Sequence, residues 1–275
     1  MKAQAFLPLF ALTGLLTISG SASALATAGV FSTYGMVNDS DSGPLTASAA
    51  GAYANRYLEG SVFAAADLSR GVLRLAVDAS PGEPFTGNAA SAFASFADTI
   101  TIVGPSASSV PVSFFLDVNA RLTGDAPDDG TFRLDFSAEL DVSGNLAPNG
   151  PSFSIVRFRN PDEDVIQCAG SCNALNAPLT TAGHVDATLA YTQNLVPNRP
   201  YDIDAVMRAT VLGARDSQLH VDAGHTARLS AVLPAGYSFS SASGGFLTAV
   251  PIPAAGWLFA SALGGLAALR RARRH

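Results

Sequence analysis

The stretch Phe132-Arg133-Leu134-Asp135-Phe136-Ser137-Ala138-Glu139-Leu140-Asp141-Val142 is the clearest indication of the fold. Apolar side chains alternate in it with polar or charged ones at every second position. Successive side chains of a β-strand point to opposite faces, so one row faces a core and the other faces water. The stretch therefore predicts a half-buried strand.

Other parts of the chain carry weaker versions of the same pattern. In residues 110–118, for example, the alternation places Val112, Phe114, Leu116 and Val118 on one face. We expect further strands over residues 72–77, 93–103, 110–118, 153–158, 185–191, 201–212, 227–233 and 237–247. Turn signals such as Gly104-Pro105 and Asn149-Gly150-Pro151 separate these runs.

Short strands between turns predict an all-β fold, a single β-sandwich or jelly-roll-like domain. The Ala-rich residues 44–66 are expected to be strand or loop, because Gly51, Gly60 and several β-compatible side chains oppose a helix. Residues 38–44 and 80–90 are expected to be loops.

The N-terminus has the three parts of an export signal. Lys2 is followed by an apolar run over residues 6–18 and then by Ala22-Ser23-Ala24, whose small residues suit a signal peptidase. The run is shorter than the roughly 20 residues that a membrane span needs. We expect cleavage after Ala24, with Ala26 and Ala28 as nearby alternatives.

The C-terminus has the features of a membrane span. Residues 252–269 carry no charge, and 18 helical residues are about 27 Å long, close to the thickness of the hydrocarbon layer. Trp257 lies near one end of this segment, where indole rings favour the headgroup region. The basic tail follows at once and is expected on the cytoplasmic side; it contains Arg270, Arg271, Arg273 and Arg274.

This C-terminal region resembles the PEP-CTERM sorting signal of exosortase substrates. The resemblance covers residues 250–275 and rests on three parts in order: a proline motif, the apolar segment and the basic tail. The motif residues are Val250, Pro251, Ile252, Pro253 and Trp257. Ile252 stands where the family's name-giving motif has glutamate, which matches a hydrophobic variant of the motif and argues against a role for a carboxylate there.

The resemblance implies a route through a Gram-negative envelope. Signal peptidase and an exosortase would be partners during export, with a transient inner-membrane intermediate. The cell surface or the extracellular matrix, rich in exopolysaccharide and biofilm, would be the destination. The expected organisation is residues 1–24 as signal peptide, 25–249 as the extracytoplasmic β-sandwich passenger and 250–275 as the sorting signal. Looser similarity to passengers of such proteins lies in residues 94–102, 226–236 and 241–244, and it assigns no chemistry.

The charge distribution agrees with this division. The formal net charge is −6, but residues 25–249 hold all 22 acidic residues and 11 arginines, a net charge of −11. An acidic body argues against nucleic acid as a partner, because phosphates are met by basic surfaces. At 48% hydrophobic residues the chain can also fill a core, which argues against disorder.

Cys168 and Cys172 are the only cysteines. An exported protein meets an oxidising compartment, so the sequence predicts a disulfide between them, which closes a short loop and adds little stability. Redox chemistry or a metal site is the alternative. A zinc site needs about four ligands, however, and no histidine lies beside the pair.

Two acidic clusters are weak candidates for calcium, and no other cofactor is expected. They are Asp125, Asp128 and Asp129, and Asp162, Glu163 and Asp164. Loop carboxylates suit Ca²⁺, but the spacing fits no EF-hand, and solvated acidic loops are the preferred interpretation.

No enzyme motif is present, and we expect no catalytic residues. His220 and His225 flank Asp222; a five-residue gap puts the two imidazoles on opposite faces of a regular strand unless Ala223-Gly224 turns. Surface histidines near a turn are the preferred interpretation.

The sequence thus predicts a structural or adhesive protein of the envelope or exopolysaccharide. A carbohydrate-binding module of the matrix is the alternative, with extracellular polysaccharide as ligand; it needs exposed aromatic side chains, for which Tyr34, Tyr53 and Tyr57 are candidates. A secreted hydrolase is the third hypothesis, since distant carboxylate pairs leave no sequence motif.

Overall fold

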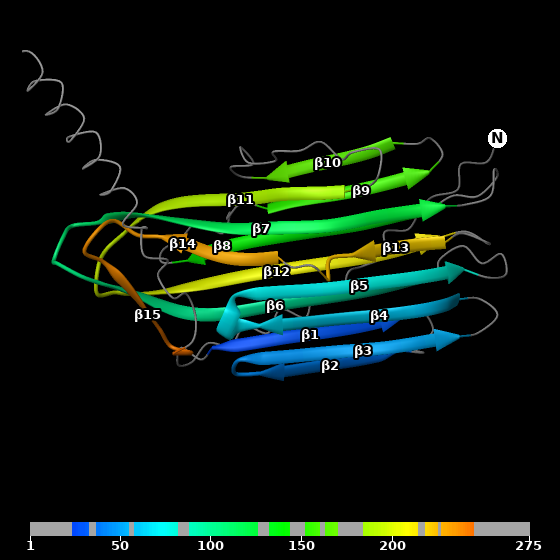
Figure 1. Ribbon diagram of the computed structural model, residues 1–275, viewed down its shortest axis with the longest axis horizontal. Coiled ribbons are helices and arrows are strands. Elements are labelled where there is room, and N and C mark those ends of the chain that lie inside the picture. The colour runs from blue at the N-terminus through cyan, green and yellow to red at the C-terminus, as the bar shows by residue number, and fades with distance from the viewer. Residues whose placement is uncertain are drawn as a thin grey trace, which may run out of the picture.

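The computed structural model describes residues 24–32, 37–54, 58–81, 88–125, 132–143, 152–159, 163–169, 184–213, 218–224 and 227–244. In this part of the chain the protein is all-β, with two antiparallel sheets whose strands run along the long axis of the molecule (Figure 1). The one helical element among these residues is a single 3-10 turn, Leu68–Arg70. The all-β prediction is confirmed.

The first sheet has the strand order β10-β9-β8-β12-β6-β1-β2, and β15 pairs with β6 outside this path. Its strands are β1 (Leu25–Ser32), β2 (Asn38–Gly43), β6 (Asn88–Val103), β8 (Phe132–Ser143), β9 (Ser152–Arg159), β10 (Glu163–Ala169), β12 (Pro200–Gly213) and β15 (Ser238–Ser241).

The second sheet has the order β11-β7-β13-β5-β4-β3, and β14 pairs with β5 and β7. Its strands are β3 (Thr46–Ala54), β4 (Leu58–Asp67), β5 (Val72–Pro81), β7 (Val110–Asp125), β11 (His184–Leu195), β13 (Gln218–Asp222) and β14 (Ala227–Val232). Both β13 and β14 lie between β5 and β7, so together they form one interrupted strand position.

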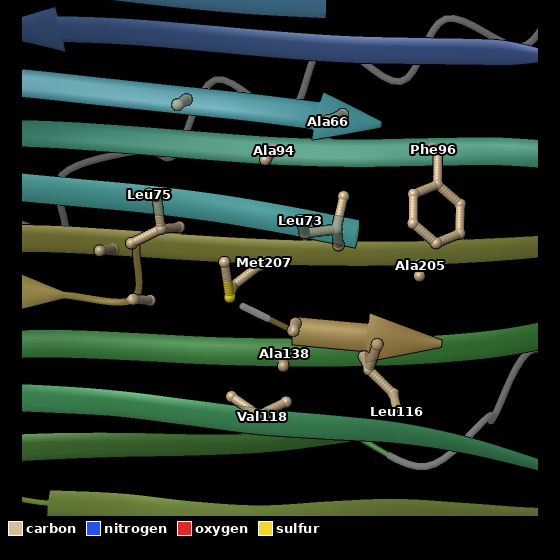
Figure 2. Close-up of a cluster of buried hydrophobic side chains, with 14 of the residues drawn as sticks. Ala66, Leu73, Leu75, Ala94, Phe96, Leu116, Val118, Ala138, Ala205 and Met207 are labelled. Carbon is tan, nitrogen blue, oxygen red and sulfur yellow. The ribbon is translucent and has the colours of Figure 1, made fainter. Parts of the chain in front are cut away.

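The core lies between the two sheets and is built from the inward rows of the alternating strands. Leu134, Phe136 and Leu140 of β8 are buried, as the alternation predicts, and so are the apolar residues of β7 from Val112 to Val118. Figure 2 shows Leu73 and Leu75 of one sheet near Met207 of the other, with Ala94, Ala138 and Ala205 in the same cluster. Large side chains facing small ones let the two layers interdigitate.

The structure corrects several boundaries. Residues 38–43, expected to be a loop, form β2, and part of the expected loop over residues 80–90 belongs to β5 and β6. Strands β1, β10 and β13 were not predicted. β2 has no apolar alternation because it is an exposed edge strand, held by its backbone pairing with β1. The Ala-rich region forms β3 and β4, which confirms the preference for strand or loop over helix.

Asp39 and Asp41 of β2 link the two sheets at one edge. Asp41 accepts a hydrogen bond from the backbone N–H of Ser48 at 2.9 Å, and Asp39 accepts one from Ala50 at 3.3 Å. These donors belong to β3, the edge strand of the second sheet. Two carboxylates therefore occupy N–H groups that would otherwise be open to pairing with another chain.

Candidate functional site

A polar pocket opens on the outer face of the second sheet, where β5, β7 and β13 lie side by side. Its volume is about 380 Å³. Its lining comprises Asp78, Ala79, Ser80, Thr123, Gly124, Gln218, Leu219 and His220. Most of these side chains donate or accept hydrogen bonds, so the pocket suits a polar ligand better than an apolar one.

Asp78 is the centre of the hydrogen bonds at this pocket. One of its carboxylate oxygens, Oδ1, is hydrogen-bonded to Nδ1 of His220, and the other accepts a bond from the Ser61 hydroxyl at 3.2 Å. The backbone carbonyl of Asp78 accepts a hydrogen bond from the Tyr53 hydroxyl at 2.5 Å. These hydrogen bonds hold both the side chain and the backbone carbonyl of Asp78 in place, and they orient the imidazole ring of His220.

The sheet register brings these residues together. Ser61 of β4 pairs with Asp78 of β5, His220 of β13 pairs with Asp78, and Thr123 of β7 pairs with His220. The four residues therefore form one row across four strands. Cross-strand partners on one face lie about 5 Å apart at Cβ, which is within reach of a side-chain hydrogen bond.

Gly60 leaves the space that this arrangement needs. A Cβ at this position would collide with the carbonyl oxygen of Asp78 and would lie 2.9 Å from the Tyr53 hydroxyl. The residue also has a φ of +156°, which L side chains rarely adopt. Burial, and secondarily the charge of Asp78, raises the pKa of Tyr53 above its ordinary value, so its hydroxyl remains a donor.

Among the residues that the structure describes, the arrangement supplies a base but no nucleophile bonded to it. A histidine held by a carboxylate through Nδ1 can present Nε2 as a proton acceptor. Acyl transfer also needs a hydroxyl or thiol bonded to that imidazole. The Ser61 hydroxyl is bonded to Asp78 instead of to His220. The polar side chains that line the pocket can donate hydrogen bonds to a ligand and accept them from it.

A second group of carboxylates lies on the outer face of the first sheet. Asp204 of β12 pairs directly with Asp141 of β8, and Asp202 is two residues away on β12. Burial, reinforced by the charges of Asp141 and Asp202, raises the pKa of Asp204 to about 6. Burial also raises the pKa of Asp141. Within the part of the chain that the structure describes, no cluster of His, Cys, Asp or Glu has the geometry of a metal site.

The calcium candidates are only partly within the described residues. Asp125 is the last residue of β7, and Glu163 and Asp164 are the first two of β10, so these three belong to strands instead of loops. Asp128, Asp129 and Asp162 lie outside the described residues. Calcium binding by either cluster stays a prediction.

The other predicted residues have mixed outcomes. Tyr53 is 4% exposed, so it cannot form an aromatic platform, while Tyr34 and Tyr57 lie outside the described residues. Cys168 is in β10 opposite Phe153, but Cys172 is not described, so the disulfide stays a prediction.

Of the two histidines that flank Asp222, the structure describes only one. His220 lies in the pocket, Asp222 accepts a hydrogen bond from the Gly224 N–H at 2.8 Å, and His225 is outside the described residues. The role of Asp78 was missed, because its partner His220 is 142 residues away in the sequence.

The comparisons with known proteins identify no relative: no family model, curated protein or solved structure matches this chain. No helix among the described residues is long and apolar enough to cross a membrane. The signal-peptide residues Ala22 and Lys2 and the whole sorting motif and basic tail, from Val250 to Arg274, lie outside those residues.

Proposed function

We propose that this chain is an exported envelope protein whose all-β body is displayed outside the cell after processing by signal peptidase and an exosortase. Its role is structural or adhesive, in the envelope or the exopolysaccharide. The tripartite N-terminal and C-terminal patterns of the sequence are the basis of the sorting route. The folded body adds independent support at both of its ends.

The main observation in support of the proposal is the position at which the first strand begins. Strand β1 begins at Leu25, the residue after the expected cleavage site. Leu25 pairs with Ala97 of β6. Beyond that point the same side of β6 is occupied, because the N–H of Ala242 is bonded to the carbonyl of Thr99 at 2.8 Å. β1 has no room to extend further along β6, which agrees with removal of the residues before it.

The end of the fold supports the C-terminal assignment. Strand β15 pairs with β6, and the described part of the chain ends soon after it, at Gly244. The expected sorting signal begins at residue 250. The last strand of the described body thus ends before the residues assigned to the sorting signal.

The pocket favours ligand binding as the second candidate function. Its polar lining could hold hydroxyl groups of a matrix polysaccharide. The aromatic platform expected for this function has no support from Tyr53, which is buried. Saturable binding of one polysaccharide on a glycan array, lost in a Gln218→Ala variant, would favour this second function.

Deletion of residues 250–275 tests the sorting route. In a host with an exosortase, the full chain should reach the surface or the matrix, and the truncated chain should accumulate in the periplasm or the medium. The same comparison in a host without an exosortase should leave the full chain in the inner membrane. If the truncated chain reached the same location in the same form as the full chain, the sorting assignment would be wrong.

A further inference from the structure

Two phenylalanine side chains lie on the outer face of the first sheet. Phe31 of β1 and Phe93 of β6 belong to the outward rows of their strands, and the residues on either side of Phe93 are buried in the core. Phe31 is 48% exposed, and Phe93 is partly exposed. Two aromatic rings are thus open to solvent on a face whose other side chains are mainly polar.

Gly29 allows the ring of Phe93 to lie against the sheet. The two residues pair across β1 and β6, and three carbons of the ring occupy the space that a Cβ of Gly29 would need, the farthest 3.2 Å from that position. The ring therefore covers the glycine and turns its other face towards solvent. Phe31 is two residues further along β1 on the same side, so its Cβ is about 7 Å from that of Phe93. We call Phe31 and Phe93 the aromatic platform.

Polar side chains surround the aromatic platform. Two rows of paired residues cross β8, β12, β6, β1 and β2 at this place. The row through Phe31 reads Asp135, Thr210, Ser91, Phe31 and Asn38, and the row through Phe93 reads Ser137, Arg208, Phe93, Gly29 and Ser40. The Ser91 hydroxyl donates a hydrogen bond to the Thr210 hydroxyl at 3.0 Å. The two rings therefore lie among hydroxyl, amide and guanidinium groups that can bond to a ligand covering them.

The charges beside the aromatic platform cancel. The two charged residues of these rows are Asp135 and Arg208, and each has an ion-pair partner on β8. Asp135 is bonded to Arg133 at 2.7 Å, and Arg208 is bonded to Glu139 at 3.1 Å. The acidic body therefore has a neutral area around these rings. Such an area suits an uncharged ligand, because a charged one gains no unpaired opposite charge from these two rows.

We propose that the aromatic platform binds a pyranose ring of an uncharged polysaccharide. A pyranose has a flat face of C–H groups and a rim of hydroxyl groups. The C–H groups pack on the electron-rich face of an aromatic ring, and the flanking Arg208, Asn38 and Ser40 can bond to the hydroxyl groups. This inference rests on the second candidate function, polysaccharide binding. It supplies the aromatic surface that the buried Tyr53 cannot, on the opposite face of the sandwich from the pocket.

The test is affinity electrophoresis of the full chain in mild detergent, through native gels that each contain one polysaccharide. The neutral probes are hydroxyethylcellulose, laminarin, dextran and galactomannan, and alginate is the acidic comparison. The variants are Phe31→Ala, Phe93→Ala and the conservative Phe31→Tyr. Phe63→Ala is the matched control, because Phe63 is 37% exposed on the outer face of the other sheet. Circular dichroism checks that each variant keeps its strands, and Phe31→Ala decides the outcome if Phe93→Ala does not fold.

At least one neutral polysaccharide should retard the wild-type chain saturably. Phe31→Ala and Phe93→Ala should raise its dissociation constant about tenfold or more, whereas Phe31→Tyr and Phe63→Ala should change it by less than about twofold. Binding that is lost in Gln218→Ala but kept in Phe31→Ala would place the polysaccharide in the pocket and overturn this inference alone. Retardation by none of the polysaccharides would overturn the second candidate function as well. Platform-dependent retardation by alginate alone, or a dimer in light scattering that Phe31→Ala dissociates, would contradict an uncharged polysaccharide as the ligand.

Discussion

Ser243 is bonded to the buried carboxylate of Asp98, 145 residues earlier in the chain. The hydroxyl of Ser243 donates to one oxygen of Asp98 at 2.7 Å, and its N–H donates to the other at 3.2 Å. Asp98 is 2% exposed and also accepts a bond from the N–H of Thr99 at 2.8 Å. The contact holds the last described residues next to the first strand, β1, on the same side of β6.

Ser243→Ala should lower the free energy of unfolding by about 1–3 kcal/mol, because a buried carboxylate loses a hydroxyl donor. Chemical denaturation followed by circular dichroism measures the change. Ser240→Ala is the matched control, since Ser240 is an exposed serine of the same strand, β15, and should change stability by less than about 0.5 kcal/mol. Equal effects of the two substitutions would show that the contact with Asp98 contributes nothing.

Asp204→Asn should stabilise the protein at pH 7. The folded-state pKa of Asp204 is raised to about 6 from an ordinary value of 3.8, so the folded protein holds this proton more tightly than the unfolded chain. The contribution of this group to stability is therefore greatest below about pH 4 and is lost as the pH rises to about 6. Removing the ionisation should add roughly 1–2 kcal/mol at pH 7, after allowance for solvent screening.

Urea titrations of wild type and Asp204→Asn at pH 4, 5, 6 and 7 test this account, with Asp186→Asn, an exposed aspartate of β11, as control. The gain should shrink steadily towards pH 4. A gain of the same size at pH 4 and pH 7 would contradict an origin in the ionisation of Asp204.

Tyr53→Phe should cost about 1 kcal/mol, because the carbonyl of Asp78 loses its donor while the ring keeps its packing. Gly60→Ala should cost more, since its methyl group meets the same backbone carbonyl and the backbone is strained. Thermal unfolding of the single and double variants gives the comparison. Fully additive costs would mean that Gly60 and Tyr53 act independently, contrary to the shared contact with Asp78.

The exported protein should contain a disulfide between Cys168 and Cys172. Intact-mass measurement after alkylation, with and without reduction, should differ by two alkyl groups. Reduction should change the melting temperature little, because a short loop has little closure entropy to lose. Two alkylated thiols without reduction would exclude the pairing.

Strands whose sequence has a clear row of apolar side chains facing the core could be predicted. Strands that form because of their pairing with neighbouring strands could not. Apolar and polar side chains alternate along β7 and β8 because one face of each strand is buried and the other faces solvent. β2 is polar throughout and becomes a strand by pairing with β1, and β1 itself carries small residues on its inward face. Neither has a period that sequence alone can identify.

The pocket was beyond sequence reasoning for a related reason. His220 and Asp78 become neighbours through the register between β13 and β5, and β13 is only five residues long. Register follows from the packing of the whole sheet. The one local signal was His220 near a polar turn, and it did not identify Asp78 as the partner.

The most direct test of the account is the N-terminus of the mature protein. Mass spectrometry of peptides from protein collected at the cell surface or in the matrix should identify Leu25 as the first residue, which is also the first residue of β1. Surface or matrix material that retains Met1 would contradict export through a cleaved signal peptide, and with it the sorting route proposed for this chain.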